Sequence, residues 1–181
     1  MELPTSGPDI PAAPNGALFQ LRAPTKEDGQ AVWELVAACP PLDQNSMYCN
    51  ILQCTHFAET CVLAERGGKP LGWLSAHCPP ADPRTLFVWQ IAVHNKARGK
   101  GLGQALLDHL LARPNLAAIT HVKATITPDN RASWSLFESL ARRLGAPLAR
   151  EDWLECDRHF GGRHAAETLI TIGPLETART P

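Results

Sequence analysis

The stretch LFVWQIAVHNKARGKGLGQALLDHLL, residues 86–111, combines three patterns that together indicate an α/β fold. Its first eight residues are mostly apolar and rich in β-branched and aromatic side chains, which predicts a strand buried on both faces. A glycine-rich turn with three basic residues follows, and from Leu102 onward apolar residues recur at helical spacing. A strand, a basic glycine turn and a helix, in this order, direct backbone N–H groups toward a phosphate.

The glycine turn predicts an anion site without identifying the anion. Gly99, Gly101 and Gly103 lack a Cβ, so the main chain can approach an anion closely. The spacing is not that of a Walker A loop, and a dinucleotide fingerprint needs GxGxxG with an acidic residue about 20 residues later. An ordinary basic turn between a core strand and a core helix remains the alternative, and the turn alone does not decide between the two.

The whole chain has the composition of one globular domain. Its 181 residues are enough for a full core, and a net charge of −1 gives no global basic field for nucleic acid. No apolar run approaches the roughly 20 residues of a membrane span, and the N-terminus lacks the features of a secretory signal. The six cysteines contain no CxxC pair and are expected to be reduced thiols, which favours the cytoplasm.

Four prolines and little apolar content indicate a disordered leader at 1–16, which is followed by a domain at 17–173 and a flexible tail at 174–181. Helices are expected after Thr25, within 42–58, from Leu102 and at 132–144. Strands are expected at 19–22, 61–66, 71–77, 86–93, 121–127, 152–156 and 167–172. This order predicts a mixed sheet with helices on both faces, and the turn-rich segments 38–50 and 157–166 are expected to contact substrate.

The pattern Arg98-x-x-Gly101-x-Gly103, with the element order above, resembles the acyl-CoA pyrophosphate loop of the GNAT N-acetyltransferase family. The resemblance implies the GNAT fold, acetyl-CoA as co-substrate and a central sheet that splays at the acyl-CoA site. The end of the central strand would then bind the pantetheine arm as a further strand does. Solvated surface charge is the alternative for Arg98 and Lys100. The cofactor residues expected here are Ile91, Ala92, Val93, Arg98, Gly99, Lys100, Gly101, Leu102 and Gly103.

A second motif, ITPDNRASWSLF, adds three expected cofactor residues. Asn130 matches an asparagine that contacts the CoA arm in GNAT enzymes, although a helix N-cap fits the sequence equally well. Ser133 follows one turn later and could also face the cofactor. Phe137 occupies the position where many members of the family carry a tyrosine that protonates the thiolate. Because a phenyl ring cannot donate a proton, the acid of this chain must lie elsewhere or be water.

Four motifs in order closely resemble the L-2,4-diaminobutyrate acetyltransferases of ectoine biosynthesis, over about residues 18–172. They are CPPLDQNSMYCNILQCTHF, LFVWQIAVHNKARGKGLG, TITPDNRASWSLF and HFGGRHAAETL. The resemblance implies acetylation of the γ-amine of L-2,4-diaminobutyrate and a homodimer. It leaves open a GNAT enzyme for another small diamine, polyamine or amino acid. The absence of the family's usual Glu and Tyr also leaves open a non-catalytic acyl-CoA sensor.

The amine must be neutral to attack, which costs about 4 kcal/mol at pH 7 for a group with a pKa near 10. The central strand offers no carboxylate, and Gln90 beside Trp89 is its polar member, an expected substrate contact. We therefore expect Asp43 to be the base or the ammonium anchor, the alternative being a turn or N-cap aspartate. Tyr48 is expected to contact substrate or relay a proton, and Trp89 to line the pocket. A core tyrosine and a sheet-core tryptophan are the alternatives.

The remaining substrate contacts are expected from two polar segments. Asn45 and Ser46 add hydrogen-bonding groups near Asp43. The substrate carboxylate needs cationic groups or amides, for which the candidates surround Gly161-Gly162: Arg158, His159, Arg163 and His164. His159 and His164 are five residues apart without a suitably spaced acidic or cysteine partner, so no metal site is expected.

Overall fold

The computed structural model describes residues 19–176, and the predicted leader 1–16 lies outside this range. The strands are β1 Gln20–Arg22, β2 Val62–Arg66, β3 Lys69–His77, β4 Thr85–Val93, β5 His121–Ile126, β6 Leu148–Leu154 and β7 Glu167–Ile172. The α-helices are α1 Gly29–Ala37, α2 Met47–His56, α3 Leu102–Leu111, α4 Arg131–Leu144 and α5 Cys156–Phe160. The short 3-10 helices are η1 Lys26–Asp28, η2 Ala58–Thr60, η3 Asn95–Ala97 and η4 Pro114–Leu116.

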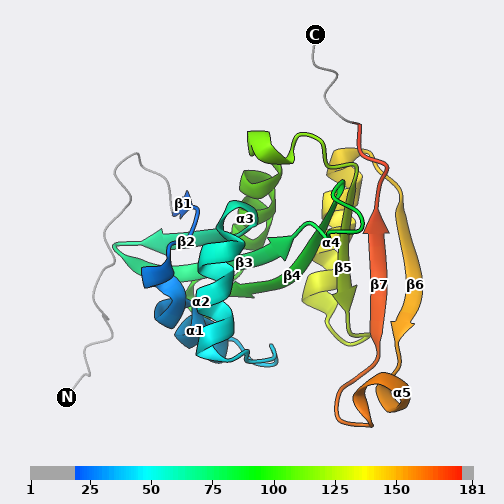
Figure 1. Cartoon of the computed structure of the whole chain (residues 1–181), viewed down its shortest axis with the longest axis horizontal. Coiled ribbons are helices and arrows are strands. Elements are labelled where there is room, and N and C mark those ends of the chain that lie inside the picture. The colour runs from blue at the N-terminus through cyan, green and yellow to red at the C-terminus, as the bar shows by residue number, and fades with distance from the viewer. Residues whose placement is uncertain (1–18, 177–181) are drawn as a thin grey trace, which may run out of the picture.

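The seven strands form one mixed sheet in the order β1-β2-β3-β4-β5-β7-β6 (Figure 1). Only β4 and β5 pair in parallel, because the long connection through α3 carries the chain back to the edge of β4. All other neighbours pair antiparallel. The predicted α/β architecture with a mixed sheet is confirmed.

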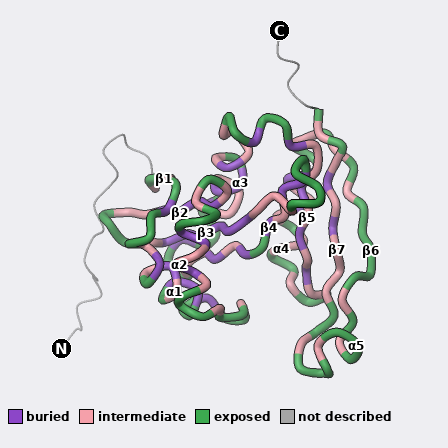
Figure 2. Tube along the Cα trace, viewed as in Figure 1, coloured by how far each residue is buried: buried purple, intermediate pink, exposed green. Residues whose placement is uncertain are grey.

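Helices cover the sheet on both faces and produce two cores. The larger core packs α3 and α4 against Leu74, Leu86, Ile126 and Ile170 of the sheet. The smaller core packs α1 and α2 against the opposite face of β2, β3 and β4. Burial is therefore concentrated along the strands, while β6 and α5 stay largely exposed (Figure 2).

The central strand contains a β-bulge at Trp89. Ser75 of β3 pairs with Gln90, whereas the next residue, Ala76, pairs with Val88, so Trp89 has no partner across this ladder. In a bulge of this kind two residues oppose one, the strand bends and the alternation of faces changes. Pairing between β4 and β5 ends at the same point, with Val88 opposite Ala124. Beyond it β4 stays paired with β3, and β5 with β7, but β4 and β5 no longer pair with each other, which confirms the predicted splay.

Most predicted elements coincide with observed ones, and the differences lie near the C-terminus. β6 begins at Leu148, four residues earlier than predicted, because most of its residues are exposed and the strand has no apolar face that local periodicity could reveal. The segment 157–166, expected to be irregular, begins with the short helix α5. Leu175 of the predicted tail donates its backbone N–H to the carbonyl of Thr120 and packs against the larger core, so ordered contacts continue to this residue.

Candidate active site

The glycine turn leaves the N-terminus of α3 open. Gly99 and Gly101 have φ angles of 71° and 72°, a conformation that side chains with a Cβ rarely adopt. Gly101 is the N-cap of α3 and provides no side-chain hydrogen bond to the helix. The first amides of a helix have no intrahelical acceptor, so those of α3 are available to an anion, which the positive end of the helix dipole also favours.

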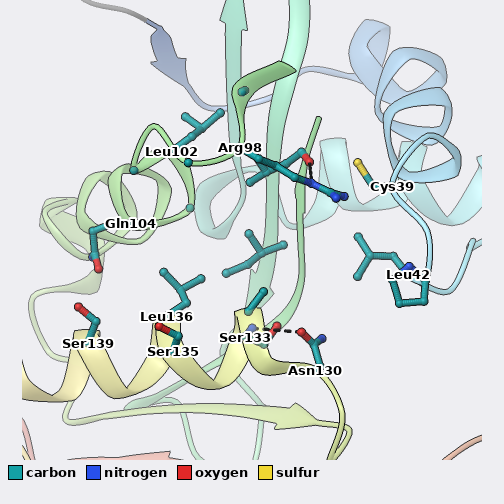
Figure 3. A pocket seen from close by; sticks show the side chains of 18 of the residues that line it. Cys39, Leu42, Arg98, Leu102, Gln104, Asn130, Ser133, Ser135, Leu136 and Ser139 are labelled. Carbon is teal, nitrogen blue, oxygen red and sulfur yellow. Dashed lines mark hydrogen bonds between the residues drawn. The ribbon is translucent and has the colours of Figure 1, made fainter. Parts of the chain in front are cut away.

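A cavity of about 690 Å³ opens beside this turn, between the ends of α3 and α4 and the segment that follows α1 (Figure 3). Nine predicted cofactor residues line it: Ile91, Val93, Arg98, Gly99, Gly101, Leu102, Gly103, Asn130 and Ser133. The splayed end of β4 forms one wall, and there its main-chain groups on the side of β5 have no strand neighbour. An elongated ligand with a phosphate at one end can therefore bind both the turn and the strand.

Two cofactor candidates have local roles in addition to lining the cavity. Asn130 is the N-cap of α4, and its Oδ1 accepts the N–H of Ser133 at 3.1 Å, so the N-cap interpretation and the cavity position hold together. Arg98 donates through Nε to the carbonyl of Val93 at 3.1 Å. Its guanidinium extends toward Cys39 on the opposite wall (Figure 3).

Three predicted cofactor residues lie away from the cavity lining. Ala92 is buried in the smaller core, on the opposite face of β4. Lys100 is exposed and donates to the carbonyl of Lys96 at 3.0 Å. Phe137 is 4 % exposed and packs in the larger core. The Phe137 side chain therefore points into the protein and away from the cavity.

Several lining residues were absent from the sequence prediction: Cys39, Pro40, Pro41, Leu42, Ala97, Gln104, Ala132, Ser135, Leu136 and Ser139. Those on α4 follow one another at helical spacing, so the small and polar face of this helix was a usable signal. Residues 39–42 belong to the turn-rich segment that was expected to contact substrate, but nothing in them indicated the cofactor, because only the tertiary fold brings the end of α1 to β4.

A second cluster of charged groups joins segments far apart in the chain. Nε2 of His164 lies 2.9 Å from Oδ2 of Asp43, a residue 121 positions earlier, and 3.8 Å from Oε1 of Glu167. Nδ1 of His164 lies 2.7 Å from the carbonyl of Ala165. With an acceptor at each ring nitrogen, the imidazole is suited to carry two protons. These bonds, first that to Ala165 and then those to Asp43, raise the pKa of His164.

Glu167 is the carboxylate that the sequence prediction missed. It begins β7, and its carboxyl group is largely buried. Burial raises the pKa of this group, against the opposing effects of His164 and of a hydrogen bond with the side chain of Thr125. A carboxylate with a raised pKa beside a cation is suited to accept a proton from an ammonium. Its place at the start of a strand gave it the appearance of an ordinary surface residue.

The structure distributes the predicted substrate residues unevenly. Asp43 lies in the cluster with His164. The N-cap of α2 is Ser46, whose hydroxyl accepts the N–H of Cys49 at 3.1 Å. The N-cap alternative for Asp43 is therefore excluded. Asn45 accepts the indole N–H of Trp33 through its carbonyl at 3.0 Å. Gln90 donates to the carbonyl of Asp43 at 2.8 Å and so joins the loop to β4.

The aromatic candidates are accessible. Tyr48 is 69 % exposed and Trp89 is 47 % exposed. The alternatives, a core tyrosine and a sheet-core tryptophan, are therefore excluded. Trp89 packs edge-to-face on His77, with 6.4 Å between ring centroids. Both rings are therefore free to contact a ligand.

Arg158 and His159 both contact Glu155, the N-cap residue of α5, the helix on which they lie. Arg158 is paired with Glu155 at 3.7 Å, and the ring of His159 accepts the N–H of Glu155 at 2.8 Å. Of the four candidates around the double glycine, His164 is the one that the structure brings to Asp43.

Within residues 19–176 no group of three or more His, Cys, Asp and Glu side chains is placed to hold a metal ion. In the same range, none of the helices combines the length and the apolar character needed to cross a bilayer.

Comparison with known proteins gives one consistent result. Residues 29–141 match the model of the acetyltransferase (GNAT) family. The chain is 45 % identical to the L-2,4-diaminobutyric acid acetyltransferase of Methylotuvimicrobium alcaliphilum, over 95 % of this chain and 98 % of the relative. It is 48 % identical to the enzyme of the same name from Vibrio cholerae, over 87 % of this chain and 90 % of the relative.

A solved structure resembles the whole fold. The diaminobutyrate acetyltransferase of Paenibacillus lautus, in complex with its substrate L-2,4-diaminobutyric acid and coenzyme A, superimposes with a TM-score of 0.83. The two sequences are 35 % identical, and the match covers 86 % of this chain and 95 % of the other.

Proposed function

Since the chain belongs to the GNAT acetyltransferases and, within them, to the L-2,4-diaminobutyric acid acetyltransferases, we propose that it acetylates the γ-amine of L-2,4-diaminobutyrate. Acetyl-CoA is the donor, and the product is N4-acetyl-L-2,4-diaminobutyrate. This product feeds the synthesis of ectoine, a compatible solute that protects cells under osmotic stress.

One observation carries the proposal: residues that line the cofactor cavity are directly followed or preceded in the chain by residues of the amine side. Leu42 and Ile91 line the cavity, whereas their neighbours Asp43 and Gln90 belong to the amine side. An acyl group at the splayed end of β4 would therefore lie next to carboxylates able to hold a cationic amine. This juxtaposition fits transfer between a CoA thioester and a diamine better than it fits a sensor that only binds CoA.

In the reaction the amine must first lose a proton. Glu167 is the best-suited base, because burial raises the pKa of its carboxyl group. Asp43 is more exposed and is suited to hold the ammonium in place, and His164 lies between the two carboxylates. Trp89 borders the same end of β4 and is free to cover the substrate chain. We assign Glu167 as the base and Asp43 as the anchor.

The neutral amine then attacks the thioester carbonyl carbon. Main-chain N–H groups on the unpaired side of β4 are suited to stabilise the oxyanion of the tetrahedral intermediate. The C–S bond breaks as the carbonyl reforms, CoA leaves as a thiolate, and the nitrogen gives up its second proton to water or to the departing thiolate, which leaves the neutral amide. A thiol has a pKa of about 8.5, so near neutral pH the thiolate can leave without the tyrosine that Phe137 replaces.

Turnover with defined products tests this function. Purified protein is incubated with acetyl-CoA and L-2,4-diaminobutyrate, CoA release is followed, and the product is assigned by NMR. We expect acetylation at the γ-nitrogen and faster turnover than with ornithine, 2,3-diaminopropionate or putrescine. Preferred acetylation of one of these amines, or of the α-nitrogen, contradicts the proposal. Stabilisation by CoA without turnover on any amine would support a sensor.

We further propose that the enzyme is a cytoplasmic homodimer. All six cysteines are free thiols, which supports a reducing compartment.

The dimer is supported by aromatic side chains that are left uncovered on one face of the sheet. Phe87 contacts Trp153 with 6.2 Å between ring centroids, and Trp153 is 44 % exposed. Exposed aromatic surface of this kind supports an interface. Light scattering of the wild type should give twice the chain mass, and Trp153→Ser should lower it. A monomeric wild type would contradict the dimer.

A further inference from the structure

The layer between the α1–α2 pair and the sheet holds an unusual concentration of buried polar side chains. Asn50 and Gln53 of α2 and Ser75 of β3 are at most 1 % exposed, and Gln90 of β4 is 8 % exposed. Buried polar groups of folded proteins are almost always hydrogen-bonded, so each of these has to be explained. Their surroundings are otherwise apolar and include Cys54, which lies in the smaller core.

Gln90 connects this layer to the amine site. The bulge at Trp89 shifts the cross-strand pairing of β4 by one residue; Trp89 is exposed, whereas Gln90, the next residue, is paired with Ser75 and buried. Nε2 of Gln90 donates to the carbonyl of Asp43 at 2.8 Å. This bond joins the loop that carries Asp43 to the central strand. Asp43 is itself exposed, and its side chain is held by His164.

The other end of the Gln90 amide needs a partner as well. Its Oε1 is buried, and none of residues 19–176 donates a hydrogen bond to it. Ser75 is the cross-strand partner of Gln90, and its hydroxyl is buried and unpaired within the same range. The hydroxyl can donate or accept, so one bridging water can satisfy Ser75 and Gln90 together.

The rest of the layer has matching requirements. Gln53 Nε2 and Trp73 Nε1 are unpaired donors among the described residues, and Asn50 Oδ1 is an unpaired acceptor. Asn50 and Gln53 already share one hydrogen bond of 2.9 Å, which fixes the orientation of both amides. Donors and acceptors are thus available in similar numbers, which is the requirement for a small group of ordered waters.

We propose that Gln90 is a positioning residue for acetyl transfer: its amide, oriented by Ser75 through an ordered water, holds the Asp43 carbonyl and thereby places the Asp43 carboxylate at the amine. The inference rests on the proposed function. Gln90 is not assigned a contact with substrate, because its side-chain NH2 group already donates to the Asp43 carbonyl.

The two charge-neutral variants Gln90→Leu and Ser75→Ala test the inference in steady-state kinetics with both substrates varied. Gln90→Leu should raise the KM for L-2,4-diaminobutyrate about tenfold while the KM for acetyl-CoA changes less than twofold, since the loop loses its bond to β4 but the cofactor cavity keeps its walls. Ser75→Ala should act in the same direction by about threefold. Equal losses for both substrates, or an unchanged KM for the amine in a folded variant, would overturn the inference.

Gln90→Glu tests the inference through the pH dependence of kcat/KM, which a general destabilisation of the fold would not change in the same way. A protonated glutamic acid can donate to the Asp43 carbonyl, whereas a carboxylate repels it, and burial favours the protonated form. The ratio of kcat/KM for this variant to that of the wild type should therefore rise as pH falls. A ratio independent of pH contradicts the proposal, even where Gln90→Leu fails to fold.

Thr85→Val is the matched control on the same strand. Thr85 is buried at the opposite end of β4, and its hydroxyl donates to Asp82 at 2.6 Å. Its loss should lower stability but leave both KM values unchanged. Wild-type turnover of L-2,4-diaminobutyrate is measured alongside, so failure of the proposed function is recognised in the wild type and failure of the inference in the variants alone.

Discussion

The cofactor side and the amine side of the site are constructed in opposite ways. The cofactor side consists mostly of main chain and regular structure: the end of β4, two glycines with positive φ and the N-termini of α3 and α4. The amine side consists of side chains on irregular segments, with Asp43 and His164 separated by 121 residues. Apart from these two glycines, the cofactor side can therefore change its residues with little effect on geometry, whereas the amine side depends on each side chain.

The strongest test of this contrast removes the base. Glu167→Gln keeps the shape of the side chain but cannot accept a proton, so kcat should fall by about 10²–10³-fold. The KM for acetyl-CoA should stay within twofold, because Glu167 does not line the cofactor cavity. Assays of CoA release at varied concentrations of each substrate measure both constants.

The pH dependence of the wild type belongs to the same test. A base acts only when deprotonated, so kcat/KM for the amine should rise with pH, and the raised pKa of Glu167 shifts this rise above the ordinary glutamate range. If the rise of kcat/KM with pH is lost in Glu167→Gln, Glu167 is the base. An unchanged profile in the variant would assign the role to another group.

Asp43→Asn should have the second largest effect. The change removes the charge that holds the ammonium but keeps the main-chain carbonyl that Gln90 contacts. The KM for L-2,4-diaminobutyrate should rise about 10–100-fold, as expected when one partner of a charge pair is lost. Asp152→Asn on the exposed edge strand β6 is the matched control and should leave the kinetics unchanged. A similar KM for both variants would exclude Asp43 as the anchor.

Gly101→Ala probes the cofactor side, where the expected effect is smaller. At φ 72° a Cβ is strained by about 1–2 kcal/mol, although no atom lies within 4 Å of it. We expect the KM for acetyl-CoA to rise about 5–10-fold while that for the amine stays constant. A matched increase in both would indicate that the two sides are not independent.

The smallest effect concerns stability. Because the folded-state pKa of His164 is raised above its ordinary value of 6.5, its bonds stabilise the protein fully below that value, and this contribution is lost as pH rises through the raised pKa. At about pH 5.5, His164→Gln should melt about 1–3 °C below the wild type, and the difference should vanish at high pH. Thermal denaturation across this range measures it, and a constant difference would contradict the assignment.

These two sides also differ in what the sequence could reveal. The strand, turn and helix between Thr85 and Leu111 follow from local periodicity and glycine placement, and their predicted bounds agree with the structure within one residue. The amine side required contacts between distant segments, so Asp43 was identified but Glu167 was not. Arg158 and His159 have the chemistry of carboxylate ligands, yet α5 engages both in its own N-terminal contacts. Residue type alone could not distinguish them from His164.

The bulge at Trp89 was equally invisible in the sequence, and it determines the orientation of half a strand. Leu86 and Val88 face the larger core before the bulge, and Ile91 and Val93 face the same core after it, so the inward positions change from even to odd numbers. If the same nine residues alternated strictly, with Trp89 paired and no bulge, Ile91 and Val93 would face away from the cofactor cavity. The bulge therefore acts as a frame correction, which lets Ile91 and Val93 line the cavity while Gln90, on the same strand, reaches the loop of the amine site.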